Sequence, residues 1–163
     1  MPTSSSDPVE PDAHLRLGPG PDSELTWLLH RAAQRMNTAV RVEAERHGLT
    51  LRDHIVLSAL HKTHGLTQIE LGHALGVDKT TLVSELDRLE KAGLIERTAD
   101  ARDRRARIPT LTAAGDALRA TVAVGAAAAE ATATQSIDPA LLSSVRDALY
   151  AIINTTDDPG SCI

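Results

Sequence analysis

The 45 residues from Thr67 to Leu111 constrain the fold most strongly, because they hold start and stop signals for two short helices and two strands in immediate succession. Thr67 and Glu70 form a T-x-x-E capping box, which satisfies free N–H groups at a helix start. A helix is therefore expected from Gln68, with apolar residues near the i, i+3, i+4 spacing of one face. Gly76 tolerates the left-handed backbone of a helix end, so a tight turn follows.

A second helix is predicted from about Lys79 to Ala92. Asp78 offers a side-chain acceptor to its first turn, leucines at three- and four-residue intervals mark a buried face, and Gly93 ends the run. Small hydroxyl and basic side chains dominate the first turns of the outward face, and such groups can reach base edges in a DNA groove. We expect this segment to be the recognition helix of a helix-turn-helix.

Two further segments, residues 94–98 and 106–111, can pair as the strands of a hairpin. Pro109 has no backbone N–H and so belongs on an edge or outward-facing position, which a two-stranded sheet provides. The loop between the strands is expected to form a wing, and its charged residues are Asp100, Arg102, Asp103, Arg104 and Arg105. The predicted fold class is mainly α with a small β-wing: a winged helix-turn-helix core plus N- and C-terminal dimerisation helices.

Helices are predicted on both sides of this core. An apolar face runs through residues 23–47, and a helix capped by Thr50 and Asp53 follows it. After the wing, Thr112 caps an Ala-rich helix and Pro139 opens a last one. The predicted organisation is a disordered Pro- and Ser-rich arm (1–22), dimerisation helices (23–47 and 112–154), a winged helix-turn-helix DNA-binding domain (48–111) and a flexible tail (155–163).

The core resembles the DNA-binding region of MarR-type transcriptional regulators in the stretch LTQIELGHALGVDKTTLVSELDRLEKAGLIER, followed by DARDRRAR and LTAAG. The specific marks are the wing pattern D-x-R-D-R-R at Asp100–Arg105 and the L-T-x-x-G at Leu111–Gly115. The resemblance implies a DNA-binding regulator, in the simplest case a repressor, that dimerises through its terminal helices. It also implies release of DNA when a small aromatic or carboxylate effector binds between the dimer helices and the winged lobe.

The segment after the wing independently favours a homodimer. Residues 117–133 are dominated by alanine, which buries little area, so this helix would be marginal alone. Helices from both ends of two chains can cover one another's apolar faces. Two recognition helices would then enter successive major grooves of a pseudo-palindromic double-stranded operator about 34 Å apart, with wing arginines in the neighbouring minor grooves. About four phosphate contacts per protomer predict a log–log salt slope of about −7.

The net charge of −5 is distributed unevenly along the chain. Residues 1–22 and 138–163 each carry −3, which leaves +1 for the segment between them. Residues 97–107 hold five arginines against two aspartates, a local charge of +3 on the expected hairpin. Phosphate contact requires such a local field rather than a basic chain.

The residues expected to contact DNA are Lys79, Thr80, Thr81, Ser84 and Arg88 on the recognition helix and Arg102, Arg104 and Arg105 on the wing. On the helix, the hydroxyl side chains are assigned to bases and the two cations to phosphates. Glu85 follows Ser84 where many similar proteins carry a basic residue, so the resemblance does not give the operator sequence. Glu85 either accepts from a cytosine amino group or pairs with Arg88 at i+3.

In the wing, Arg104 or Arg105 is assigned to the minor groove. Asp103 is expected to orient a neighbouring arginine through a charge-assisted hydrogen bond. The alternative is a solvated charged loop that binds nothing.

Effector contacts are harder to assign from the sequence. The candidates are Trp27, His30, Arg31, His54 and His61, which could combine an apolar wall with donors for an anion. Trp27 and His30 could equally well be packing residues of the dimer interface. The sequence does not identify the effector or the regulated genes.

Composition excludes several other classes of protein. Phe is absent and Trp27 and Tyr150 are the only aromatic residues, so stacking of single-stranded bases on aromatic side chains is not expected. An enzyme is not expected, because the chain has no phosphate-cradling glycine loop, nucleophile elbow or framed pair of carboxylates. No apolar run of about 18 residues and no secretory signal is present, which predicts a cytoplasmic protein without a membrane partner.

Two alternatives remain open: a winged-helix protein-interaction module without DNA binding, and a metal-responsive regulator. The first has no reason to keep arginines at the wing tip. Seven histidines invite the second, but no H-x-x-x-H or C-x-x-C spacing lies on an expected helix. No cofactor is expected, and the first predicted helix has no cysteine for a redox switch, since the single cysteine is Cys162.

Overall fold

The computed structural model of the protein describes residues 19–101 and 103–154. The chain divides into two compact units, residues 1–34 and 35–163, and helix α1 (Leu25–Arg46) crosses the boundary between them. In the first unit, a turn closed by a 2.9 Å hydrogen bond from Gly20 N to Ser23 Oγ precedes the first part of α1. Most of the predicted N-terminal arm and all of the predicted tail, including Cys162, lie outside the described residues.

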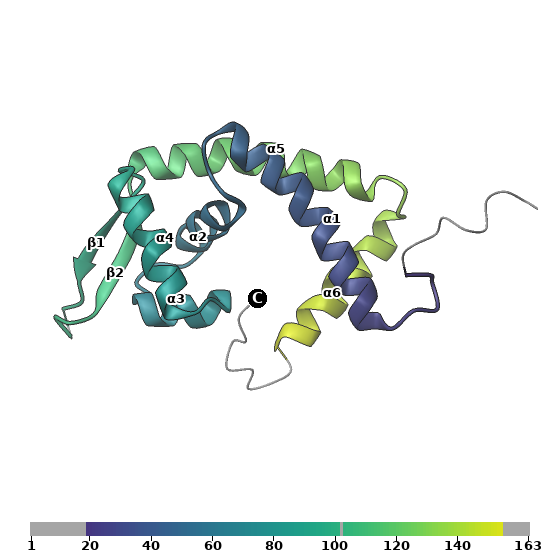
Figure 1. The fold of residues 1–163 in the computed structure, drawn as a ribbon, viewed down its shortest axis with the longest axis horizontal. Helices are drawn as coiled ribbons and strands as arrows, with labels where there is room; N and C mark the ends of the chain where they lie inside the picture. Colours follow the sequence, from purple (N-terminus) through teal and green to yellow (C-terminus); the bar gives the residue numbers. More distant parts are fainter. Residues whose placement is uncertain (1–18, 102, 155–163) are drawn as a thin grey trace, which may run out of the picture. The chain divides into compact units, whose positions relative to one another are not determined.

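The second unit contains the rest of α1 and the remaining helices and strands. These are α2 (Leu51–Lys62), α3 (Gln68–Leu75), α4 (Lys79–Lys91), β1 (Ile95–Ala99), β2 (Arg107–Leu111), α5 (Ala113–Thr134) and α6 (Pro139–Asn154). The predicted mainly α architecture with a small β-wing is confirmed (Figure 1). No helix of the described segments combines the length and the apolar character needed to cross a bilayer.

Local signals place the helix ends where the sequence predicts them. Thr67 N donates to Glu70 Oε2 over 2.7 Å while Glu70 N donates to Thr67 Oγ1 over 3.3 Å, which completes the capping box of α3. Gly76 ends that helix with φ 62°, a left-handed conformation that costs glycine little. The turn to α4 is therefore short, and it fixes the crossing of the two helices.

The apolar face of α4 forms the centre of the winged head, a name used here for α2, α3, α4, β1, β2 and the start of α5. Leu82, Leu86 and Leu89 are at most 1% exposed. They belong to one core cluster with Leu57 of α2, Leu71 of α3, Ile95 of β1 and Val122 of α5. Burial of each leucine contributes about 2 kcal/mol of hydrophobic stabilisation. The recognition helix is thus fixed by a core that it shares with α2, α3, β1 and α5.

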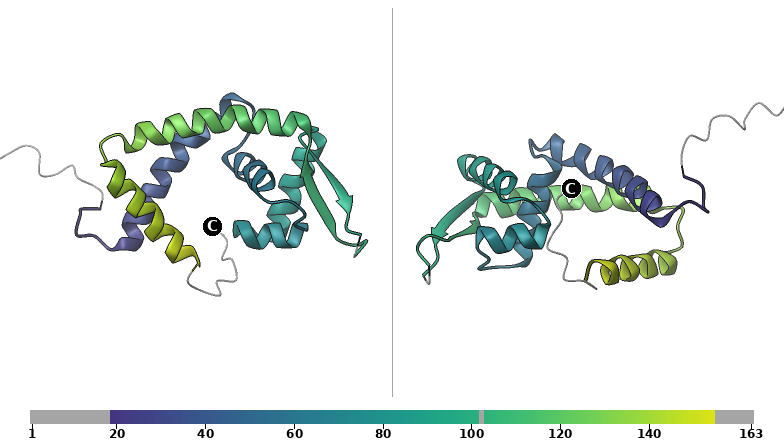
Figure 2. Two further views of the ribbon diagram at one scale, coloured as in Figure 1. Left: turned by 180° about the vertical axis from the view of Figure 1, so that it is seen from behind. Right: turned by 60° about the horizontal axis from the view of Figure 1, so that its bottom comes forward.

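The wing is an antiparallel hairpin in which Ile95 pairs with Leu111 and Ala99 with Arg107. Pro109 lies opposite Arg97 on a strand with one free edge, as predicted, although its ring is buried rather than outward-facing. The hairpin extends beyond helices α2–α4 in both views of Figure 2. It therefore offers its tip to a partner outside the head.

The start of α5 is fixed to the base of the wing. Thr112 N donates to Leu94 O over 3.1 Å, and Thr112 Oγ1 donates to Gly93 O over 2.8 Å. A side chain at Gly115 would collide with the Leu94 carbonyl, which is backbone and cannot move aside. This close approach explains the glycine of the L-T-x-x-G pattern.

We predict that Gly115→Ala lowers the free energy of unfolding by about 2–4 kcal/mol, because the new methyl overpacks against the Leu94 backbone. Urea denaturation measures the change. Gly125→Ala is the matched control in the same helix: its methyl also collides, but the three nearest atoms belong to the side chain of Glu43, which can rotate away, rather than to backbone. The control should stay within about 1 kcal/mol of the parent. Equal effects of the two substitutions would contradict the role assigned to Gly115.

Candidate nucleic-acid interface

The exposed surface of α4 forms a narrow stripe. Thr80, Ser84, Asp87 and Lys91 are all exposed and follow one another by three or four residues, opposite the buried leucines. Two hydroxyls therefore occupy the first half of the stripe, where a recognition helix meets bases. Of the residues predicted to contact bases, the structure brings Thr80 and Ser84 together on this face.

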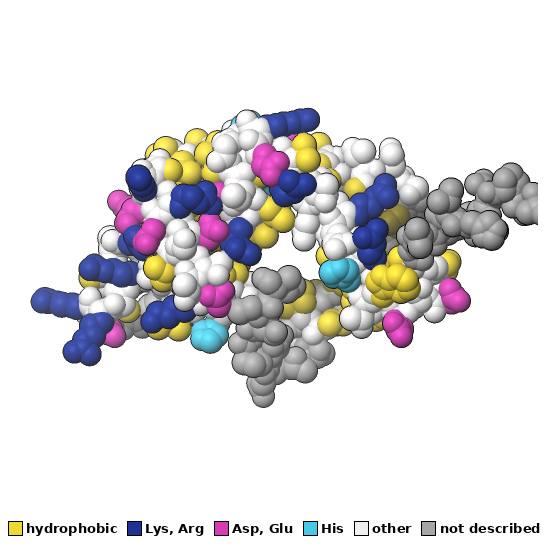
Figure 3. All heavy atoms as spheres, viewed as in Figure 1, with side chains coloured by type: hydrophobic (Ala, Val, Ile, Leu, Met, Phe, Trp, Pro, Cys, Tyr) yellow, Lys and Arg dark blue, Asp and Glu magenta, His cyan; other side chains and the backbone are white. Residues whose placement is uncertain are grey.

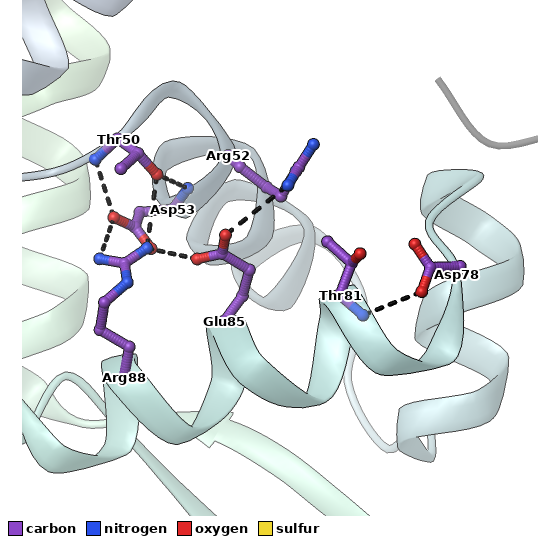
Figure 4. Close-up of polar contacts among 7 residues, drawn as sticks. All are labelled: Thr50, Arg52, Asp53, Asp78, Thr81, Glu85 and Arg88. Atoms are coloured by element: carbon purple, nitrogen blue, oxygen red, sulfur yellow. Dashed lines mark hydrogen bonds and ion pairs between the residues drawn. The ribbon is translucent and has the colours of Figure 1, made fainter.

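Thr81 lies beside the stripe and is half-buried. Its backbone N–H donates to Asp78 Oδ1 over 2.9 Å, which caps α4 (Figure 4). Hydrogen bonds from the Thr81 side chain and then from its backbone lower the pKa of Asp78, so the cap is ionised at neutral pH. The backbone of Thr81 is thus engaged at the helix start, and of the three predicted base-reading residues only Thr80 and Ser84 are exposed.

The flank of α4 that faces α2 carries a cluster of charged groups around Asp53 (Figure 4). Asp53 is fully buried, and its Oδ2 accepts from Thr50 N over 2.8 Å and from an Arg88 terminal nitrogen over 2.6 Å. The other terminal nitrogen of Arg88 contacts Asp53 Oδ1 and Glu85 Oε2. Arg52 lies 3.7 Å from the second oxygen of Glu85.

These contacts change the interpretation of two residues. Arg88 is predicted to contact phosphate; its guanidinium binds Asp53 and Glu85, and its side chain is 45% exposed. Hydrogen bonding to Asp53, followed by that to Glu85, raises the pKa of Arg88 despite its partial burial. For Glu85, the i+3 pairing with Arg88 is the alternative that the structure contains.

On the opposite flank of α4, an arginine of the wing neutralises two acidic side chains. The side chain of Arg97 on β1 is only 17% exposed and lies 2.7 Å from Asp87 Oδ1. Its Nε donates to Glu90 Oε2 over 3.0 Å, and this hydrogen bonding lowers the pKa of Glu90. All three acidic residues of α4 are therefore paired with arginines. Sequence reasoning assigned Arg97 to the charge of the wing and missed this pairing.

The wing tip presents arginines to solvent (Figure 3). Arg104, Arg105 and Arg107 are exposed, while Arg102 lies outside the described residues. Asp103 Oδ1 accepts from Arg105 N over 2.9 Å. This hydrogen bond orders the backbone of the turn at Arg105, and the orienting of a neighbouring arginine side chain by Asp103 stays a prediction.

A cleft of about 430 Å³ separates the recognition helix from the wing. Lys79 and Val83 of α4, Ile69 of α3, and Arg105 and Arg107 of the wing contribute to its lining. The lining thus includes cations from both elements, together with apolar side chains, polar groups of α3 and the carboxylate of Asp78.

The predicted effector residues divide between the two units. Trp27, His30 and Arg31 belong to the first unit and are exposed. His54 and His61 lie on α2 in the second unit, where His61 Nδ1 is 3.1 Å from Asp116 Oδ1.

His54 is partly buried, and its Nδ1 is enclosed without a hydrogen-bond partner among the described residues. Burial and the charge of Arg119 lower the pKa of His54, against an opposing effect of Glu130. Within residues 19–101 and 103–154, no three His, Cys, Asp or Glu side chains are grouped to hold a metal ion.

Comparison with known proteins agrees with this geometry. Residues 47–106 match the sequence profile of the MarR family. The chain is 36% identical over 84 residues to the HTH-type transcriptional regulator TtmR of Methylorubrum extorquens, covering 52% of this chain and 43% of that protein. It is 34% identical over 102 residues to an HTH-type transcriptional repressor of Mycobacterium tuberculosis, covering 63% of this chain and 73% of the repressor.

A solved structure extends the likeness to the terminal helices. CouR from Rhodococcus jostii RHA1, crystallised with p-coumaroyl-CoA, superposes with a TM-score of 0.74 at 26% identity. The match covers 82% of this chain and 94% of CouR.

We predict that His54 makes folding stability fall in mild acid. Because its folded pKa lies below the ordinary value of 6.5, acidification through 6.5 protonates the unfolded chain first and favours unfolding. His54→Gln should therefore lose less stability than the parent between pH 7.5 and 5.5 in urea denaturation. His64→Gln, at an exposed position, is the control and should follow the parent. Parallel losses in the parent and His54→Gln would contradict the prediction.

Proposed function

The chain belongs to the MarR family of transcriptional regulators and carries the family's DNA-binding winged helix; from this premise we propose that it is a homodimeric repressor of a pseudo-palindromic operator, released by a small-molecule effector. In this role it acts in the cytoplasm, in contact with duplex DNA. The hydroxyl stripe of α4 beside a wing tip with three exposed arginines, Arg104, Arg105 and Arg107, carries the proposal.

The stripe and the tip match the two grooves of a duplex. Thr80 and Ser84 can donate or accept at base edges in the major groove, and the methyl of Thr80 suits a thymine methyl. Arg104 or Arg105 fits a narrow minor groove, where the negative potential is strongest. Lys79 and Arg107, which are also exposed, then lie next to phosphates.

The cleft between α4 and the wing supports the same placement. A strand of the sugar-phosphate backbone separates a major groove from the adjacent minor groove, so it must pass between a helix in one and a wing in the other. The cleft lies between those two elements, with Lys79 on one side and Arg105 and Arg107 on the other. Its apolar side chains suit the sugars, and its three cations outnumber the one carboxylate, Asp78, which suits the phosphates.

A second copy of the chain is the partner that the terminal helices require. Helix α6 buries none of its residues, and Leu141, Ile152 and Ile153 are 58%, 53% and 72% exposed. An apolar face of this extent needs a cover. Association through α1, α5 and α6 would place two heads on a twofold axis, as two half-sites about 34 Å apart require.

The effector remains a small aromatic or carboxylate compound. CouR, with its bound p-coumaroyl-CoA, shows that a protein of this fold accepts an aromatic acyl ligand. Trp27, His30, Arg31, His54 and His61 stay the proposed contacts, and the enclosed, unpartnered Nδ1 of His54 favours that residue. Release requires only that the ligand prefer a spacing of the two heads that differs from the DNA-bound one.

We predict that Arg104→Ala with Arg105→Ala weakens binding to every duplex and makes the log–log salt slope shallower by about 3.6, because a dimer loses four cations near phosphates. Fluorescence anisotropy at several salt concentrations measures both quantities. Arg46→Ala with Lys62→Ala removes the same charge away from the head's DNA face and should leave the slope unchanged. Unchanged duplex affinity in the wing variant would favour a protein-interaction module instead.

We predict that Leu141→Glu with Val145→Glu converts the dimer to a monomer, because two carboxylates on the apolar face of α6 oppose its burial. Sedimentation equilibrium gives the mass. Ala140→Glu with Ser143→Glu adds the same charge to the polar side of the helix and should remain dimeric. A monomeric parent at micromolar concentration would overturn the proposed assembly.

A further inference from the structure

We propose that Asp53 and Arg88 form a positioning pair for DNA recognition, in which the buried carboxylate sets the orientation of α4 and Arg88 contacts neither base nor phosphate. The inference rests on the proposed function, because it concerns how the same helix reads an operator. It assigns to α2 a part in sequence discrimination, although no side chain of α2 is proposed to contact a base.

The geometry around Asp53 restrains α4 in more than one direction. Both carboxylate oxygens accept from Arg88, so the guanidinium is held by two bonds rather than one. A planar fork of this kind fixes orientation as well as distance. Arg88 reaches this carboxylate from 35 residues further along the chain, and the pair therefore joins two helices.

The same carboxylate completes the capping box of α2. Asp53 Oδ2 accepts from Thr50 N while Asp53 N donates to Thr50 Oγ1 over 3.1 Å, and Arg88 also reaches Thr50 Oγ1 at 3.4 Å. The contact point on α2 is thus a helix end whose own hydrogen bonds hold it in place. A rotation of α4 about its axis would break bonds at that end, so α2 acts as a fixed reference.

Glu85 and Arg52 complete the cluster. Glu85 accepts from Arg88 and lies 3.7 Å from Arg52, so two carboxylates face two guanidiniums and the cluster is neutral. The side chain of Arg88 is 45% exposed, but a phosphate that drew its terminal nitrogens away would leave a fully buried carboxylate without its cation. The cluster therefore holds these nitrogens toward α2 rather than toward DNA.

The Asp53–Arg88 contact anchors α4, and the positions of the base-reading residues depend on this anchor through helix geometry. Ser84 and Thr80 lie one and two turns before Arg88, about 6 and 12 Å along the axis. A binding site must be held within about 0.5 Å of its productive geometry, so a small rotation at the anchor removes the base contacts. Contacts between the wing cations and phosphates tolerate such a change, because they carry no sequence information.

The test compares a duplex that the parent selects from a random-sequence pool with a shuffled duplex of the same length. Asp53→Asn with Arg88→Met keeps an acceptor for the α2 cap and leaves no buried charge unpaired, so this double variant should fold. Arg88→Lys keeps the charge but not the planar fork. The control is Asp116→Asn with Arg119→Met, which removes an ion pair within α5. Thermal midpoints and salt slopes are recorded for all proteins.

The double variant should lose at least about tenfold in affinity for the selected duplex, with the shuffled duplex bound as by the parent, because only base contacts are displaced. Arg88→Lys should lose discrimination partially, and the control should keep it. A salt slope shallower by about 1.8 on both duplexes would identify Arg88 as a phosphate contact in the dimer and overturn the proposal. A folded double variant with the parent's discrimination would also overturn it. Failure of the parent to bind any duplex would instead overturn the proposed function.

Discussion

The burial of one helix face determines the arrangement of the winged head. Leu82, Leu86 and Leu89 share one core cluster with residues of α2, α3, β1 and α5, so the recognition helix is held by the common core. With three leucines buried, the polar side of α4 is left outside, including Thr80 and Ser84. The position of Thr80 and Ser84 toward a partner therefore follows from hydrophobic packing.

The charge that the winged head presents depends on which acidic side chains are paired with arginines, rather than on the net charge of the chain. The chain is acidic overall, and α4 itself carries three acidic residues, a poor surface for a polyanion. Arg88 on one flank and Arg97 on the other bind these carboxylates, which leaves the exposed arginines of the wing tip to set the local field. A protein of net charge −5 can in this way present a cationic edge to DNA.

Short-range signals made the fold predictable. The signals are local in sequence: capping boxes, the glycine at position 76 and the turn residues of the wing each involve only a few neighbouring residues. The helices and strands of the head accordingly begin and end within about two residues of their predicted bounds. The partners of Arg88 and Arg97 could not be predicted in this way. Asp53 is 35 residues from Arg88, and the capping box already accounts for an aspartate at this position. Nothing in the sequence therefore indicates a second partner for it. The sequence alone gives no physical reason for the glycine of the L-T-x-x-G pattern, because the Leu94 carbonyl that excludes a side chain there lies against it only in the folded chain.

Hydroxyl-radical footprinting on a selected duplex tests most directly whether two winged heads read one face of DNA. A twofold dimer should protect two clusters of sugars centred about 10 base pairs apart on the same face, with further protection where the wings meet the flanking minor grooves. A single protected cluster, or protection without helical periodicity, would contradict the proposed recognition of an operator by a dimer.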